Sequence, residues 1–124
     1  MLGSIRTGDG MICKGGCYLT FGENFITVKW PAIISYHEDI NYMDILSIFR
    51  SQNYSKIKIV YLKNGQKESI VFVSSPILIK KELLSDFVQN KLKYYNLRLI
   101  EYSLGSRGFS KIVEWIRFWI FYNT

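Results

Sequence analysis

The side chains best able to do chemistry are few in this sequence. His37, Glu38 and Asp39 place the single histidine beside two carboxylates, a combination that can transfer protons. Because the three residues are expected on a turn between strands, we interpret them as a solvated polar cluster. The chain has no P-loop, dinucleotide fingerprint, nucleophile elbow or metal-binding histidine pair. The sequence therefore predicts a protein that is not an enzyme and needs no cofactor.

Cys13 and Cys17, in CKGGC, are the two cysteines of the chain. A structural zinc site usually needs four Cys or His ligands, and His37 is the single histidine, so we expect no intrachain metal site. A bend at the two glycines could permit a disulfide. Nothing else indicates secretion, and we expect buried thiols in a reducing cytosol.

Length and charge restrict the class of protein without naming a function. A chain of 124 residues is expected to form one domain. It carries 16 Lys and Arg against 10 Asp and Glu, a net charge of +6. This charge suits contact with phosphate or an anionic membrane surface, and it also suits simple dispersal in water. The candidate contacts for an anionic ligand gather around one predicted hairpin: Arg50, Lys56, Lys58, Lys63 and Lys67.

Short β-branched and aromatic runs between turn residues predict a series of strands. After a Gly-rich N-terminus, which we expect to be flexible over residues 1–10, six strands are predicted, and a seventh is predicted near Leu97. Alternation places Ile45 and Ile48 on opposite faces of one strand, so a shared face would require a bulge. The six predicted strands span residues 17–21, 25–30, 33–36, 44–50, 56–62 and 67–73.

The hairpin in KIKIVYLKNGQKESIVFV is the most specific local prediction. Asn64-Gly65 suits a type I′ turn, since both residues tolerate positive φ. The turn sets Lys63 opposite Gln66, and each further pair follows from it. One face of the hairpin is then a core face, formed by Ile57, Ile59, Ile70 and Phe72.

Residues 75–96 have the pattern of one long amphipathic helix. Ser75 is a suitable N-cap, and Pro76 suits the first helical position. Spacing by 100° per residue predicts that one side of this helix covers the sheet. That apolar side holds Ile77, Leu84, Phe87, Val88, Leu92 and Tyr95.

The last residues, KIVEWIRFWIFYNT, predict a second helix whose last turn is apolar on nearly all sides. It is shorter than the roughly 20 residues needed to cross a bilayer, so we do not expect a transmembrane helix. Such a surface must be buried against its own domain, a partner chain or a bilayer interface. Aromatic side chains dominate interface energetics, which makes five of them candidate partner or membrane contacts: Trp115, Phe118, Trp119, Phe121 and Tyr122.

The succession of antiparallel strands followed by a helix resembles the pleckstrin-homology-like superfamily over about residues 17–95. The segment from Ile40 to Ile48 is similar to the pattern I-x-Y-x-D-I-x-x-I found in bacterial PH and GRAM-like domains. The resemblance implies an α+β fold, in which a bent meander of 6–7 antiparallel strands is capped by the long helix. It divides the chain into a flexible N-terminus (1–10), a PH-like domain (11–96) and a C-terminal strand and aromatic helix (97–124).

The resemblance implies a cytoplasmic interaction module, with a peripheral membrane location left open. Such a module would dock a protein partner, a second copy of itself or an anionic membrane surface. The alternative is a small basic protein of a virus or mobile element that associates with nucleic acid or regulates the host. Salt distinguishes the two hypotheses, because phosphate contacts weaken steeply as salt rises.

Overall fold

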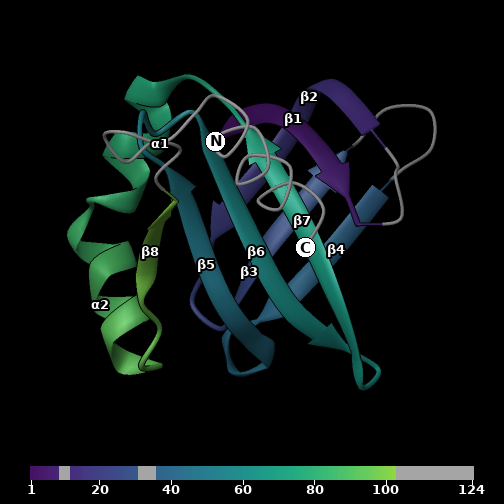
Figure 1. The fold of residues 1–124 in the computed structure, drawn as a ribbon, viewed down its shortest axis with the longest axis vertical. Coiled ribbons are helices and arrows are strands. Elements are labelled where there is room, and N and C mark those ends of the chain that lie inside the picture. Colours follow the sequence, from purple (N-terminus) through teal and green to yellow (C-terminus); the bar gives the residue numbers. More distant parts are fainter. Residues whose placement is uncertain (9–11, 31–35, 103–124) are drawn as a thin grey trace, which may run out of the picture.

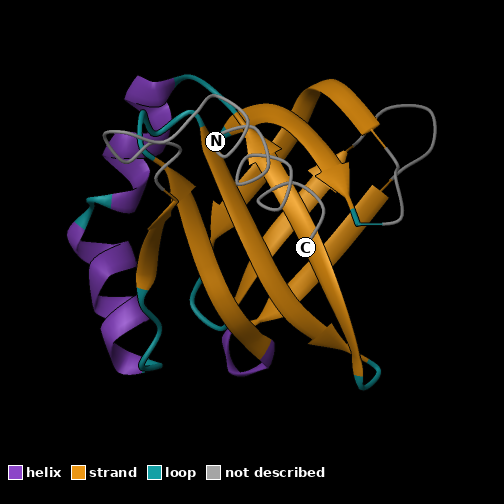
Figure 2. Ribbon diagram, in the orientation of Figure 1, coloured by secondary structure: helices purple, strands orange, loops and turns teal. Residues whose placement is uncertain are grey.

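The computed structural model describes residues 1–8, 12–30 and 36–102. These residues form a mixed eight-stranded sheet and two α-helices, an α+β architecture (Figure 2). In chain order the elements are β1 (Leu2–Thr7), β2 (Ile12–Phe21), β3 (Phe25–Trp30), β4 (Tyr36–Asn41), a 3₁₀ turn (Tyr42–Asp44), β5 (Ile45–Ser51), β6 (Lys56–Lys63), β7 (Gln66–Val73), α1 (Pro76–Leu83), α2 (Asp86–Tyr94) and β8 (Leu99–Tyr102).

The sheet has the strand order β4-β3-β2-β1-β7-β6-β5-β8. All neighbouring strands are antiparallel except β5 and β8, which are parallel. The sheet is strongly curved, so that β5, β6 and β7 lie across β2, β3 and β4 (Figure 1). The inner faces of both halves supply one core, to which the two helices also contribute.

The sheet corrects the prediction of a meander of 6–7 antiparallel strands. It has eight strands, because residues 2–7 add a strand that pairs with both β2 and β7. β8 enters parallel to β5, because the two helices carry the chain from β7 back to that edge. The predicted strand 33–36 is displaced as well, and β4 runs over Tyr36–Asn41.

The prediction of a flexible N-terminus over residues 1–10 is wrong for Leu2–Thr7, which is the central strand β1. Ile5 belongs to the core and is 1% exposed. Gly3 is required by close packing, since a Cβ there would overlap the carbonyl oxygen of Val73 and the ring of Phe72. The glycine that suggested flexibility therefore allows β1 to approach β7 closely.

The hairpin of β6 and β7 confirms the prediction made from Asn64-Gly65. Both turn residues have positive φ, 53° for Asn64 and 78° for Gly65. Lys63 pairs with Gln66, and the register continues inward as predicted. The four residues of the predicted core face, Ile57, Ile59, Ile70 and Phe72, are all buried at 1% exposure or less.

The segment from Ile40 to Ile48 lies at the turn between the two halves of the sheet. Tyr42 is buried, stacks on Tyr95 with ring centroids 4.9 Å apart, and donates a hydrogen bond from Oη to the carbonyl oxygen of Gly22 at 2.9 Å. Ile45 and Ile48 are both buried, and the register of β5 shifts between Ile45 and Ser47. This irregularity is what a shared core face for the two residues requires.

The single long helix predicted for residues 75–96 is instead two helices, α1 and α2, separated at Leu84 and Ser85. The Ser85 hydroxyl accepts a hydrogen bond from the Val88 N–H at 3.3 Å and so caps α2. The break changes which residues face the core. The helical residues that are buried are Ile79, Leu83, Val88 and Leu92.

Candidate functional site

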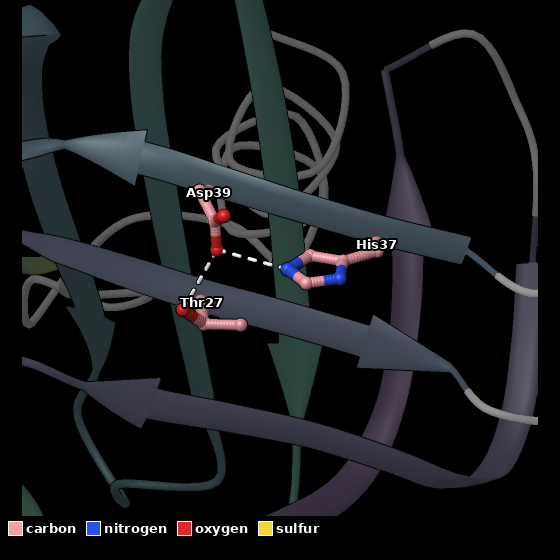
Figure 3. A network of polar contacts seen from close by, with 3 residues as sticks. All are labelled: Thr27, His37 and Asp39. Carbon is pink, nitrogen blue, oxygen red and sulfur yellow. Dashed lines mark hydrogen bonds and ion pairs between the residues drawn. The ribbon is translucent and has the colours of Figure 1, made fainter.

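The polar cluster predicted at residues 37–39 is divided between the two faces of β4. Figure 3 shows the outward part, in which one carboxylate oxygen, Asp39 Oδ1, lies 2.8 Å from Thr27 Oγ1 and 3.0 Å from His37 Nε2. Hydrogen bonds from His37 and then Thr27 are the main causes that lower the pKa of Asp39. Glu38 faces the other way and pairs with Lys63 Nζ at 2.9 Å.

This arrangement is poorly suited to nucleophilic catalysis. Activation of a hydroxyl requires a base that contacts it and an orienting group behind that base. Here the carboxylate of Asp39 lies between the hydroxyl and the imidazole, so His37 contacts neither Thr27 nor a nucleophile through Nε2. The His37 and Asp39 side chains are about half exposed. We interpret the network as a surface contact between β3 and β4.

Two hollows accompany these strands, and neither has the features of a built site. One, of about 180 Å³, lies between β4 and the hairpin and includes Glu38, Asp44 and Lys63 in its wall. The other, of about 300 Å³, lies over β2 and β3 and is lined by Tyr18, Thr20, Thr27 and Lys29. Among the described residues, no group of histidine, cysteine and acidic side chains could hold a metal ion.

The five basic residues predicted to meet an anionic ligand do not form one patch. Lys58 is 2% exposed, and burial followed by the charge of Lys67 lowers its pKa to about 8. Burial also lowers the pKa of Lys56. Lys63 lies at the hairpin tip, where its hydrogen bond to Glu38 raises its pKa.

Arg50 belongs to a separate group at the opposite end of the hairpin. Its guanidinium lies 4.2 Å from the centre of the Tyr54 ring and 3.4 Å from the carboxylate of Glu101. The ammonium of Lys80 lies 5.6 Å from the same ring centre. Cation–π contacts of this kind hold cations in place, so Arg50 is already engaged within the fold.

The clearest exposed apolar surface lies on the outer side of α1 and α2, which we call the helix patch. Ile77 is 80% exposed and Leu84 is 50% exposed. Ile77, Lys81 and Leu84 follow one another at helical spacings of four and three residues and so share one side of the segment. The remaining exposed apolar members of the helix patch are Leu78 and Phe87.

The helix patch corrects the predicted core side of the helix. Ile77, Leu84 and Phe87 were expected to cover the sheet, but all three are exposed. The break at Leu84 and Ser85 resets the helical phase, and the core is filled by other residues. The signal was available in the sequence, because Ser85-Asp86 inside a helical pattern is a potential N-cap followed by an acidic first-turn residue.

The predicted partner or membrane contacts of the tail, Trp115, Phe118, Trp119, Phe121 and Tyr122, lie outside the described residues, as does the predicted C-terminal helix. The predicted C-terminal strand is present as β8. Cys17 is a fully buried thiol whose Sγ lies 3.6 Å from the carbonyl oxygen of Gly15. Neither helix in the described part of the chain is long and apolar enough to span a membrane.

The chain matches no protein-family model, and it matches no curated protein. Its function must therefore be argued from its own surfaces. The helix patch is the strongest of them, because two consecutive helices carry four exposed apolar side chains, and large exposed apolar surfaces mark interaction sites.

Proposed function

We propose that the protein is a non-enzymatic docking module that binds an anionic membrane surface through the helix patch. The observation that carries the proposal is the exposure of Ile77, at 80%, beside further exposed apolar side chains on the same helical segment. In this proposal the protein is cytoplasmic and lies peripherally on the membrane.

The charge around the helix patch favours a membrane over an uncharged apolar partner. Lys80 and Lys81 are exposed within the patch. Across α1 and α2 the lysines are Lys80, Lys81, Lys91 and Lys93, against Glu82 and Asp86, which leaves two positive charges in excess. Each basic residue near an anionic leaflet contributes roughly 1 kcal/mol, and apolar side chains beside lysines are typical of interfacial helices.

The fold proposed for this module is pleckstrin-homology-like. Support comes from the order of the elements, in which a succession of antiparallel strands ends in the β6–β7 hairpin and is followed by helices that enter the core. Two features depart from the expected pattern. The helix is divided at Ser85, and β8 is added at the edge beside β5.

Vesicle sedimentation tests the membrane proposal directly. Wild-type protein and the double variant Ile77→Ser/Phe87→Ser are mixed with vesicles of phosphatidylcholine alone or with 30% phosphatidylserine. We expect the wild type to prefer the anionic vesicles, and the double variant to partition at least about tenfold less, since each buried apolar side chain contributes about 1.5–3 kcal/mol.

Met43→Ser is the matched control, because Met43 is 81% exposed but lies in the 3₁₀ turn rather than on the helices. This variant should bind like the wild type. Absence of wild-type binding, equal binding to neutral and anionic vesicles, or an equal loss in Met43→Ser would each contradict the proposal.

A further inference from the structure

Two cations of this protein lie against the same aromatic ring. The guanidinium of Arg50, on β5, lies 4.2 Å from the centre of the Tyr54 ring, and the ammonium of Lys80, on α1, lies 5.6 Å from the same point. We call these three residues the Tyr54 cluster. Because both distances meet at one ring, the two charges are no farther apart than about one Debye length, which is ~10 Å at 0.1 M salt. Cations at this separation repel each other unless an anion lies between them.

The described residues neutralise the Tyr54 cluster only in part. Glu101 lies 3.4 Å from Arg50, which is longer than the roughly 2.7–2.9 Å of a strong charge-assisted hydrogen bond, and its side chain is 45% exposed. Within residues 1–8, 12–30 and 36–102, Lys80 forms no ion pair with a carboxylate. The cluster therefore keeps an excess positive charge, which favours an anionic ligand.

The turn between β5 and β6 holds Tyr54 in place before any ligand arrives. Tyr54 has a φ of 59°, which is uncommon for a bulky residue, and its N–H donates to the Ser51 carbonyl oxygen at 3.0 Å. The Ser51 hydroxyl accepts hydrogen bonds from the N–H groups of Ser55 and Lys56 at 2.9 and 3.0 Å. The turn is therefore tied together on both sides of Tyr54, and a preorganised site loses less entropy on binding.

Arg50 and Lys80 differ in a way that suits binding from solvent. The Arg50 side chain is 17% exposed, and it donates to the Ser51 carbonyl oxygen at 3.2 Å and to Glu101 at 3.4 Å. A guanidinium has five N–H donors, so these contacts position Arg50 and leave donors for a ligand. Lys80 is exposed, and its flexible stem allows the ammonium to follow a ligand.

The Tyr54 cluster adjoins the helix patch through Lys80. Lys80 follows Ile77 by three residues and precedes Leu84 by four, spacings that make neighbours on a helical segment. Interfacial helices immerse their apolar side by about 5–10 Å, at the boundary between headgroups and acyl chains. A membrane contacted by Ile77 and Leu84 therefore places its lipid phosphates within reach of Lys80.

We propose that the Tyr54 cluster binds the phosphate monoester of a lipid headgroup, as in phosphatidic acid. A phosphate monoester carries about −1.5 to −2 charges at neutral pH and has three acceptor oxygens, so it can accept hydrogen bonds from Arg50 and Lys80 together. A phosphodiester, as in phosphatidylserine, keeps a single negative charge and has fewer free oxygens. This inference rests on the proposed membrane docking and adds a preferred headgroup to it.

Vesicle sedimentation with two anionic lipids tests the preference. The phosphatidylserine vesicles are compared with phosphatidic acid vesicles adjusted to the same zeta potential. The wild type should bind the phosphatidic acid vesicles at least threefold more tightly, and Lys80→Gln should lose this preference. Arg50→Lys keeps the charge but lacks the planar fork of donors, and it should reduce the preference as well.

Lys81→Gln is the matched control, because Lys81 is the neighbouring exposed lysine of α1 and lies outside the Tyr54 cluster. It should weaken binding to both kinds of vesicle by the same factor and so keep the preference. Equal wild-type binding to both vesicles, a preference that survives Lys80→Gln, or one that Lys81→Gln also removes would each overturn this inference alone. Binding to neither kind of anionic vesicle would overturn the membrane proposal together with it.

A soluble phosphate monoester distinguishes a lipid from a free phosphate compound as the ligand. Glycerol 3-phosphate has the same phosphate chemistry but cannot contact the helix patch, so it must offset the cost of association through the Tyr54 cluster alone. At about 1 mM it should leave wild-type binding to phosphatidic acid vesicles within twofold. Loss of the preference at this concentration would assign the cluster to a free phosphate compound and would overturn its assignment to a lipid.

Discussion

Two regions of this protein carry large apolar side chains outside the core, and they differ in exposure. Val60 and Val71 lie on the side of β6 and β7 that faces away from the core, which we call the outer sheet face, and are nearly inaccessible. On the helix patch, in contrast, Ile77 is 80% exposed and Leu84 is 50% exposed. Apolar side chains outside the core therefore have two different roles in this protein. The buried surface contributes to stability, and the open surface is available to bind a ligand. Substitutions in the two regions should accordingly affect different measurements.

The largest effect on stability is expected from neighbouring residues on the two sides of β7. Phe72→Ala in the core should lower the free energy of unfolding by about 3–5 kcal/mol, and Val71→Ala on the outer sheet face by about 1–3 kcal/mol. Urea denaturation followed by circular dichroism measures both changes. A loss below about 0.5 kcal/mol for Val71→Ala would be typical of a solvent-exposed site and would remove the distinction between the two regions.

On the helix patch the expected order of effects is reversed. Ile77→Ser and Leu84→Ser should each change the free energy of unfolding by less than about 0.5 kcal/mol, because neither side chain is buried. Each should nevertheless reduce partitioning onto anionic vesicles by roughly tenfold. A large loss of stability together with unchanged partitioning would show that the helix patch is structural.

The burial of Lys58 also predicts how the free energy of unfolding depends on pH. Its pKa is lowered to about 8 in the folded protein, from an ordinary value of 10.5. Between these two values the unfolded chain binds more protons at this residue than the folded protein, so stability should rise with pH. The free energy of unfolding of the wild type relative to Lys58→Met should increase by about 2 kcal/mol between pH 8 and 10.

Chemical denaturation at pH 7.5, 8.5, 9.5 and 10.5 measures this difference. Comparison with Lys58→Met removes the contribution of other titrating groups, including Tyr42, whose pKa burial raises to about 12. A difference that stays constant over this range would show that Lys58 titrates alike in both states. Its environment on the outer sheet face would then be wet.

The smallest effect is expected on the opposite half of the sheet, where Asp39 joins β3 and β4. Asp39→Asn should lower the free energy of unfolding at pH 7 by less than about 1 kcal/mol, because the contacts are exposed. The folded-state pKa of Asp39 is lowered, so its contribution is present above the ordinary value of 3.8 and is lost as pH falls through the lowered value. Denaturation of both proteins from pH 7 towards acid tests this sign.

Local sequence patterns predicted the parts of the fold that depend on local physics. The turn chemistry of Asn64-Gly65 determined the register of β6 and β7, and alternation identified the core face of that hairpin. Strand parity also indicated that Ile45 and Ile48 could share a face only with a bulge, and the register of β5 shifts at that point. In each case neighbours in the sequence decide the conformation, so no knowledge of distant contacts was required.

The errors arose where distant contacts decide the structure. Gly3 suggests flexibility when read alone, and its role becomes clear only from the closeness of Val73 and Phe72. Three residues of the helix patch, Ile77, Leu84 and Phe87, were predicted to face the core, because a continuous helix over residues 75–96 would place them on one side with Val88. The cap at Ser85 interrupts that phase. The basic residues were grouped by their nearness in sequence. Strand register places Lys56, Lys58 and Lys67 on one side of the sheet, with Lys58 buried, whereas Lys63 and Arg50 lie at opposite ends of the hairpin.

Solvent paramagnetic relaxation of methyl-labelled protein tests the central distinction most directly, because it reports the accessibility of each side chain. With a soluble gadolinium agent, we expect the Val60 and Val71 methyl groups to relax as slowly as those of Ile59 in the core. The methyl groups of Ile77 and Leu84 should relax much faster. Relaxation of Val60 and Val71 at the rate of Ile77 would show that the two apolar surfaces are equally accessible to solvent and would overturn the distinction between them.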